Sequence, residues 1–364
     1  MDKLKYSQYE WQIILQNVDT GTQYNITNIT TEATYTTELM TGNAGTLELQ
    51  LVNIPDELSA KKGTETVDFL TKVDANKHGH TVQFSISGEG IFLGYITNVE
   101  ITEQHNFKIT ARDSIFWLKS KDYLYTEDMT ASDIFADVAS RKANINHAVR
   151  VGSSAVLKPY NYSFDYTMFA QIEHAIKAAI LAEPGNWYII RDEFGTLVFT
   201  ELSELFTGII LGDLPVRQAG DEYAISYKYN STIEQETYNY IKAFRPNEDI
   251  GMFDTWVAKD SDNISRWGQL NKIVEVDKEM TDAEVYRHTR ELLVFHNLPT
   301  ETFSIKAFGH IGVYAGNGIT LQIGKIGQQG PPAGRAGHYW VEKAKHTFRN
   351  NYHVMDLELF YFNG

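Results

Sequence analysis

The chain has 364 residues, a formal net charge of −15 and no cysteine. The lack of cysteine excludes disulfides, cysteine-ligated zinc and thiol nucleophiles. The acidic balance of 47 Asp and Glu against 32 Lys and Arg argues against stable nucleic-acid binding, which depends on basic side chains that neutralise phosphates.

The N-terminal region, residues 1–112, is predicted to be a β domain. Thr46–Leu51 and Val82–Ile86 alternate apolar and polar residues with period two, as half-buried strands do. Gly88–Gly90 is predicted to form a turn after the second strand. Residues Tyr95–Ala111 then follow as a long hairpin.

Residues 113–215 have the pattern of a small α+β domain with two helices and a hairpin. Thr130 is predicted to cap the first helix, with Asp133 at the third helical position. Thr167 begins the second helix, which should end by Glu183 because Pro and Gly follow. Trp187–Thr200 is then expected to form a hairpin.

From residue 216 the β pattern returns. Ala224–Tyr229 alternates, and Tyr238–Phe244 is the expected partner strand. Residues 246–267 appear as a polar stretch, and Thr281 then begins a capped helix. We therefore predict a second β domain from residues 216–245 and 300–364, interrupted by an insertion at 246–299 that holds one capped helix.

The chain is predicted to end in a long hairpin. Its strands are Tyr339–His346 and His353–Phe362, with Asn350–Asn351 at the turn, where Asn tolerates the left-handed backbone that such turns require. Tyr339–Met355 can be laid against Tyr95–Ala111 with apolar positions matching at several places. This similarity between the two ends indicates a duplicated β domain. The glycine-rich segment Gly324–Gly337 is expected to be a loop.

Few residues form a pattern that would carry chemistry. Two histidine pairs and two acidic pairs are the candidates: His78 with His80, His346 with His353, Glu234 with Glu236, and Asp260 with Asp262. Two imidazoles without a third ligand favour an exposed turn over a metal site, and His346 and His353 are favoured as polar strand positions that could face each other. Among 47 acidic residues such pairs arise by chance. We therefore predict no catalytic residue, no cofactor and no metal.

Five segments in this order resemble a known family of tail proteins. They are Gly94–Ile96 leading into Phe107–Asp113, Met129–Ile134, Asn186–Asp192 with Gly195–Leu197, Asn263–Leu270, and Tyr339–Ala344 followed by His346–Phe348 and Tyr352–Leu359. The chain resembles the hub proteins of contractile-tail baseplates, in particular the type found in defective prophages and tailocins. That type is similar in fold to the large-phage hub that seats the central spike.

The resemblance implies a mainly β fold with α+β insertions: two tube-like β-barrel domains, a small α+β domain and a helix-containing insertion. It implies a non-enzymatic hub of a phage-like contractile injection system, a homotrimer whose pseudo-sixfold ring contacts the tail tube protein, the central spike and other baseplate proteins. DNA could pass through such an acidic ring without binding. Residues of the two hairpins are expected to support assembly: Tyr95, Phe107, Trp340, Val341, His346, Phe348, Tyr352, Leu357 and Leu359.

Two other functions remain open at this stage. The 21 tyrosines also suit a tail-associated module that binds carbohydrate or a receptor, and paired carboxylates are the machinery of a glycoside hydrolase. No apolar run approaches the roughly 20 residues needed to cross a bilayer, and the N-terminus lacks a signal-peptide pattern. We therefore expect a virion or tail-particle protein made in the bacterial cytoplasm, with no membrane partner.

Overall fold

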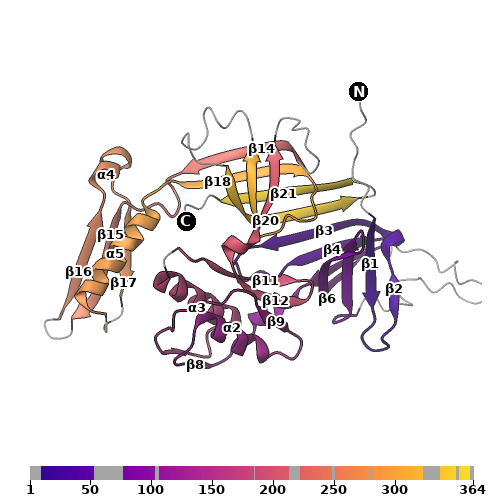
Figure 1. Ribbon diagram of the computed structural model, residues 1–364, viewed down its shortest axis with the longest axis horizontal. Coiled ribbons are helices and arrows are strands. Elements are labelled where there is room, and N and C mark those ends of the chain that lie inside the picture. The colour runs from indigo at the N-terminus through magenta and orange to yellow at the C-terminus, as the bar shows by residue number, and fades with distance from the viewer. Residues whose placement is uncertain are drawn as a thin grey trace, which may run out of the picture. The chain divides into compact units, whose positions relative to one another are not determined.

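The computed structural model describes residues 10–52, 77–102, 106–183, 185–212, 222–247, 251–276, 278, 280–322, 337–349 and 352–360. Two compact units are present (Figure 1): Met1–Tyr227 with Ser304–Gly364, and Lys228–Phe303. The fold is mainly β with a large curled sheet, which confirms the predicted fold class. The finer division into the four predicted domains stays a prediction.

The N-terminal strands form one part of a 13-stranded sheet, in the order β3-β4-β7-β6-β5-β1-β2. Leu47, Leu49 and Leu51 of β4 are buried and the residues between them are not, as the alternation predicts. The β5–β6 turn lies at Ser87–Gly88, slightly earlier than expected. The strands are β1 (Trp11–Gln16), β2 (Gln23–Asn25), β3 (Thr30–Glu38), β4 (Thr46–Leu51), β5 (Thr81–Ile86), β6 (Glu89–Ile101) and β7 (Phe107–Arg112).

The other six strands of this sheet pair in a closed circuit. Its order is β19-β13-β14-β18-β21-β20, and β20 pairs back onto β19. The closing pairs are short, because β13 pairs with only Glu222 and Tyr223 of β14 and β19 pairs with only His338, Tyr339 and Trp340 of β20. The strands are β13 (Phe206–Gly212), β14 (Glu222–Thr232), β18 (Thr300–Phe308), β19 (Gly318–Gln322), β20 (His338–Arg349) and β21 (Tyr352–Phe360).

The two parts of the sheet repeat one topology. In chain order, β1, β3, β4, β5, β6 and β7 correspond to β13, β14, β18, β19, β20 and β21. The neighbour order is β3-β4-β7-β6-β5-β1 in the first part and β14-β18-β21-β20-β19-β13 in the second. The two parts differ in detail, because β1 runs antiparallel to β5 whereas β13 runs parallel to β19 and also pairs with β14. The shared order agrees with the similarity between the two ends of the sequence.

Between these parts lies an α+β segment whose two helices begin where their caps predict. Thr130 and Asp133 form a complete capping box at α2, and the Thr167 hydroxyl accepts a hydrogen bond from the first turn of α3, whose C-cap is Glu183. The elements are η2 (Ser114–Lys119), β8 (Leu124–Thr126), α2 (Ala131–Ser140), β9 (Asn146–Val149), β10 (Tyr160–Tyr162), α3 (Met168–Ala182), β11 (Tyr188–Glu193), β12 (Thr196–Glu201) and η3 (Leu202–Leu205).

The second unit is a three-stranded sheet with two helices: β15 (Tyr240–Asn247), β16 (Met252–Lys259), α4 (Ser261–Trp267), β17 (Asn271–Glu275) and α5 (Asp282–His296). The capping box that predicted α5 is present. Two expectations are wrong. Strand β15 pairs with β16 and β17 instead of β14, and residues 246–267 contain a strand and a helix, not only a polar stretch.

Two expected features lie outside the described residues. These are the turn at Asn350–Asn351 and nearly all of the loop Gly324–Gly337. Where the chain is described, no helix is both long enough and apolar enough to cross a membrane.

Candidate assembly site

The last hairpin keeps one face buried although its sequence changes phase. Val341 of β20 is buried, and the next buried positions are Ala344, His346 and Phe348. The shift from odd to even positions coincides with a break in the β20–β21 register between Val341 and Lys343. Because successive side chains of a strand point to opposite faces, this bulge restores the buried face after one extra residue.

Phe348 joins the hairpin to the core of the N-terminal strands. Its ring belongs to the same buried cluster as Phe84 of β5, and the two ring centroids are 4.9 Å apart in an edge-on arrangement. On the other side, the His353 ring stacks on Phe348 at 4.0 Å. Burial of an aromatic side chain of this size contributes roughly 1.5–3 kcal/mol. The C-terminal hairpin therefore completes a core that begins more than 250 residues earlier.

Strand β20 has two neighbours along one edge. Its first residues pair with β19, and the stretch from Lys343 to Phe348 then pairs antiparallel with β3, from Glu38 to Ala33. We call this β20–β3 pairing the seam. At the start of this seam the Lys343 Nζ lies 2.6 Å from a Glu38 carboxylate oxygen. The hydrogen bond lowers the pKa of Glu38 and raises the pKa of Lys343. The ammonium is partly exposed, so the pair contributes at most about 1 kcal/mol.

His346 and His353 face each other across the hairpin. His346 Nε2 lies 2.7 Å from the Val313 carbonyl oxygen, which can only accept, so this nitrogen carries the proton. His346 Nδ1 is then an acceptor for the Nε2–H of His353 at 3.0 Å. Gly309 packs closely against the His353 ring, since a Cβ added to Gly309 would lie 2.1 Å from a ring atom.

Burial keeps these imidazoles neutral. It lowers the pKa of His346 to about 4, and it lowers the pKa of His353 to about 2 with a further contribution from the nearby His346. Burial also lowers the pKa of His310, which lies close enough to affect both. A charged imidazole here would lose its hydration on burial. The arrangement suits neutral hydrogen bonding inside a packed strand pair.

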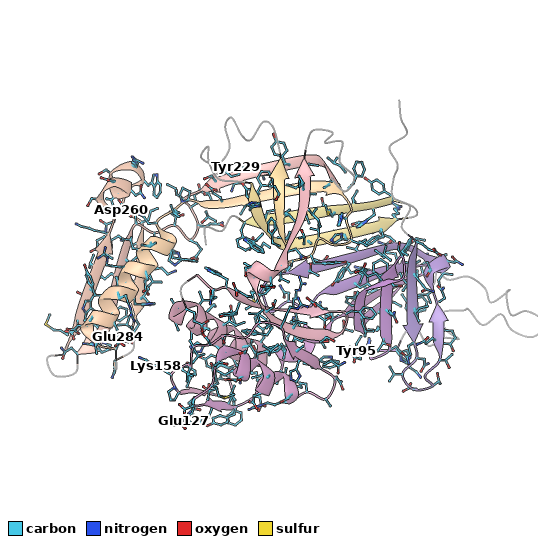
Figure 2. All side chains as sticks on the ribbon, in the orientation of Figure 1. Tyr95, Glu127, Lys158, Tyr229, Asp260 and Glu284 are labelled. Atoms are coloured by element: carbon cyan, nitrogen blue, oxygen red, sulfur yellow. The ribbon has the colours of Figure 1, made fainter. Side chains whose placement is uncertain are left out.

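The structure brings only some of the predicted assembly residues together. His346 and Phe348 meet at the seam, and Phe107 belongs to the same buried cluster as Phe348. Trp340 packs in another cluster. The Tyr95 ring on β6 (labelled in Figure 2) lies edge-on to Trp117, 5.6 Å away. Val341, Leu357 and Leu359 are buried, whereas Tyr352 is 44% exposed. Their role in assembly stays a prediction.

The contacts of the other residues considered for chemistry favour structural roles. Asp260, labelled in Figure 2, caps α4 by accepting from two backbone N–H groups. These bonds, that of Asn263 first, and a bond from Asn297 lower its pKa. A general acid would need a raised pKa. His78 is exposed, while His80 is buried and accepts from the Val18 N–H. Across the described residues, no group of three or more His, Asp or Glu is placed to hold a metal ion.

Sequence reasoning missed the partners of the hairpin. Strand β3 supplies the whole seam, and Val313 supplies the carbonyl that fixes the His346 tautomer. Neither partner is a neighbour in sequence. The strand-like segment Thr30–Glu38, with its many Thr residues, is the one local signal that could have marked a further strand.

Comparison with known proteins gives a consistent result. A family model described as YQBQ-like matches residues 33–360. The chain is 24% identical over 330 residues to the uncharacterized protein YqbQ of Bacillus subtilis, covering 88% of this chain and 92% of that one. It is 23% identical over 296 residues to the phage-like element PBSX protein XkdQ of the same species, covering 77% and 81%.

Solved structures share the fold at low sequence identity. A tail protein from Neisseria meningitidis matches with a TM-score of 0.65 and 12% identity, covering 96% of both chains. An E. coli component of the type VI secretion system, described as structurally similar to tail proteins of bacteriophage T4, matches with a TM-score of 0.51 and 10% identity. That match covers 92% of this chain and 74% of the other.

Proposed function

The chain belongs to the YqbQ-like family of phage-tail and baseplate proteins, as its sequence resemblance indicated, and we propose that it is the hub subunit of a contractile-tail baseplate. Three copies form a pseudo-sixfold ring that joins the tail tube to the central spike. The named relatives include a phage-like element protein and a tail protein. This supports a structural role without turnover and a location in the tail particle.

The repeated strand order is the observation that carries this proposal. Each chain offers two β parts with the same neighbour order. A ring closes when heterologous contacts return on themselves. Three chains with two similar parts each present six similar surfaces, which suits a sixfold tube on one side and a threefold spike on the other.

The seam inside the chain predicts the seam between chains. Strand β20 of the second part pairs with β3 of the first. By correspondence, β6 of the first part should pair with β14 of the second part in a neighbouring copy. The β5–β6 register ends at Tyr95 of β6, and the β13–β14 register ends at Tyr223 of β14. Beyond these points Ile101 on β6 is 53% exposed, and Ile225 and Tyr227 on β14 are 46% and 39% exposed. Exposed strand edges are templates for pairing with another chain.

The spike-side partner is supported by a structural neighbour. The type VI secretion component that shares this fold is described as similar to two tail proteins of bacteriophage T4. As the family resemblance implies, the chain contacts a spike protein on one face of the ring and the tube on the other. Other baseplate proteins would surround it.

A cysteine scan tests the predicted contact in a chain that has no cysteine of its own. Asn98→Cys or Glu100→Cys on β6 is combined with Ile225→Cys, Ser226→Cys or Tyr227→Cys on β14, which makes six double variants. Purified tail particles carrying each variant are oxidised and run on a non-reducing gel. At least one pair should give covalent dimers and trimers.

The control places the two cysteines across the seam within one chain. Lys345 and Thr36 are opposite each other in the β20–β3 register, so Lys345→Cys with Thr36→Cys should form a disulfide that leaves the chain monomeric. If this control closes and particles assemble, but all six test pairs stay monomeric, the proposed ring contact is wrong. Absence of the chain from tail particles would refute the hub function itself.

A further inference from the structure

A cavity of about 200 Å³ lies in the first unit beside the β11–β12 hairpin. Its lining includes Tyr35 of β3, Asp113 after β7, Arg191 and Asp192 of β11, and Tyr314 from the segment before β19. The volume is below the roughly 300–1,000 Å³ of sites for drug-sized ligands. It suits a fragment about the size of one side chain.

The turn that connects β11 to β12 contributes Phe194 to the lining of this cavity. Phe194 and Gly195 have φ values of 50° and 80° and connect β11 to β12 as a two-residue turn. The first position of such a turn usually holds Asn, Asp or Gly, because a larger side chain is strained at positive φ. The Phe194 ring lies against Gly90, where a Cβ would approach it to 2.5 Å. The turn therefore places an aromatic ring at the cavity.

The buried carboxylates of the cavity already accept hydrogen bonds from the backbone. Asp113 accepts from the N–H groups of Gly45 at 2.8 Å and Ile115 at 3.0 Å. Asp192 accepts from the N–H groups of Gly195 at 2.7 Å and Ser114 at 3.3 Å. Since a carboxylate offers about four acceptor positions, each of them can still accept from one further donor.

Two residues of the lining, Arg191 and Tyr314, each carry a donor atom that has no such partner. Arg191 uses Nε and Nη2 to hold a Glu193 carboxylate oxygen, at 2.8 and 2.5 Å. Its Nη1 and the Tyr314 hydroxyl are buried, and neither has a hydrogen-bond partner among the described residues. A buried polar group without a partner costs free energy, so native structures normally supply one.

We propose that this cavity binds an uncharged primary carboxamide, either a small molecule or the side chain of a Gln or Asn residue on another polypeptide. The ligand carbonyl accepts from Arg191 Nη1 and the Tyr314 hydroxyl. The ligand NH₂ donates to the spare acceptor positions of Asp113 or Asp192. The apolar part of the ligand packs on the aromatic lining.

The charged residues of the lining favour an uncharged ligand over an anion or a cation. The lining holds five carboxyl residues, Glu38, Glu89, Asp113, Asp192 and Glu193, against a single arginine. An anion would satisfy the two donors but would lie beside carboxylates. A cation would satisfy the carboxylates, but it would leave the Tyr314 hydroxyl and Arg191 Nη1 without acceptors and would lie beside the guanidinium. Burial raises the pKa of Asp113 and Asp192, which also favours an uncharged occupant.

The test compares three probes of one size: propionamide, propionate and propylammonium. Saturation-transfer NMR on the full chain at pH 7 measures the affinity of each. Propionamide should bind at least about fivefold more tightly than either charged probe, the effect of one added hydrogen bond. A blocked Gly-Gln-Gly peptide tests whether the carboxamide belongs to a polypeptide or to a small molecule. If the peptide binds more tightly than propionamide, the ligand is a polypeptide side chain. If it binds more weakly, the ligand is a small molecule.

Tyr314→Phe removes one of the two donors and keeps the ring. It should weaken propionamide binding about fivefold while leaving the unfolding midpoint unchanged or raised, because the lost hydroxyl has no partner to lose. Tyr352→Phe, at an exposed tyrosine outside the cavity, is the matched control and should bind propionamide as the wild type does. The proposal is overturned if no probe binds, if a charged probe binds most tightly, or if Tyr314→Phe binds propionamide unchanged.

Discussion

The Phe348→Ala variant tests whether the C-terminal hairpin holds the N-terminal core together. Phe348 is 4% exposed, and its ring packs with rings from three other strands, β1, β5 and β21. Truncation of a buried Phe costs about 3–5 kcal/mol, because apolar contacts are lost and a cavity remains. Domains are stable by only about 5–15 kcal/mol in total. The variant should therefore lose a large part of the stability of the first unit.

Urea unfolding of the full chain, followed by tryptophan fluorescence, measures this loss. Hydrogen exchange adds a local reading: amides of β3 should exchange faster, because β3 pairs with the strand that carries Phe348. Tyr352→Ala is the control on the same hairpin and should cost less than about 1 kcal/mol, since the side chain is 44% exposed. Equal losses for the two variants, or an unchanged β3 exchange rate in Phe348→Ala, would refute the reasoning.

Two further predictions concern pH and a helix cap. The pKa values of His346 and His353 are lowered in the folded chain, so the unfolded chain binds more protons. The free energy of unfolding should therefore fall as the pH drops below about 6.5. His353→Phe should reduce the slope of this free energy against pH by about 1.4 kcal/mol per pH unit between pH 6 and 5. Urea midpoints across this range check it, with the exposed His78→Ala as control; an unchanged slope in His353→Phe contradicts it. Thr281→Ala should lower the stability of the second unit by about 1 kcal/mol, because it removes the cap of α5. Amide hydrogens in the first turn of α5 should then exchange faster than in the wild type, and equal exchange rates would contradict the capping role.

Local patterns in the sequence were sufficient to predict most elements. The cap residues Thr130, Thr167 and Thr281 each mark the start of a helix, because the bonds they make lie within four residues. Period-two alternation gives β4 for the same reason, since burial of one face is visible in the strand itself. Strand β16 was not predicted. Its Met252 and Phe253 are adjacent and both exposed, so the segment shows no alternation there.

Strand partners could not be predicted in this way. Alternation shows that Tyr238–Phe244 is extended, but the same pattern fits any neighbouring strand, and β15 pairs within the second unit instead. In the candidate site too, local contacts could be predicted from the sequence and distant ones could not. His346 and His353 could be placed face to face from the hairpin alone, whereas the seam with β3 joins residues about 300 positions apart and has no local signature.

The repeated topology makes one nonlocal contact predictable once the structure is known. Taken as an isolated chain, the molecule would expose Ile101 at one strand end and Ile225 on another strand, and accessible apolar edges favour uncontrolled association. Heterologous pairing of such edges gives open fibres unless the rotation between copies closes. The β20–β3 seam already sets a rotation between the two corresponding parts of one chain. If the contact between chains repeats that rotation and the rotation closes after six parts, every β6 and β14 edge is paired within a finite ring. The exposed edges then become the contacts that define the assembly.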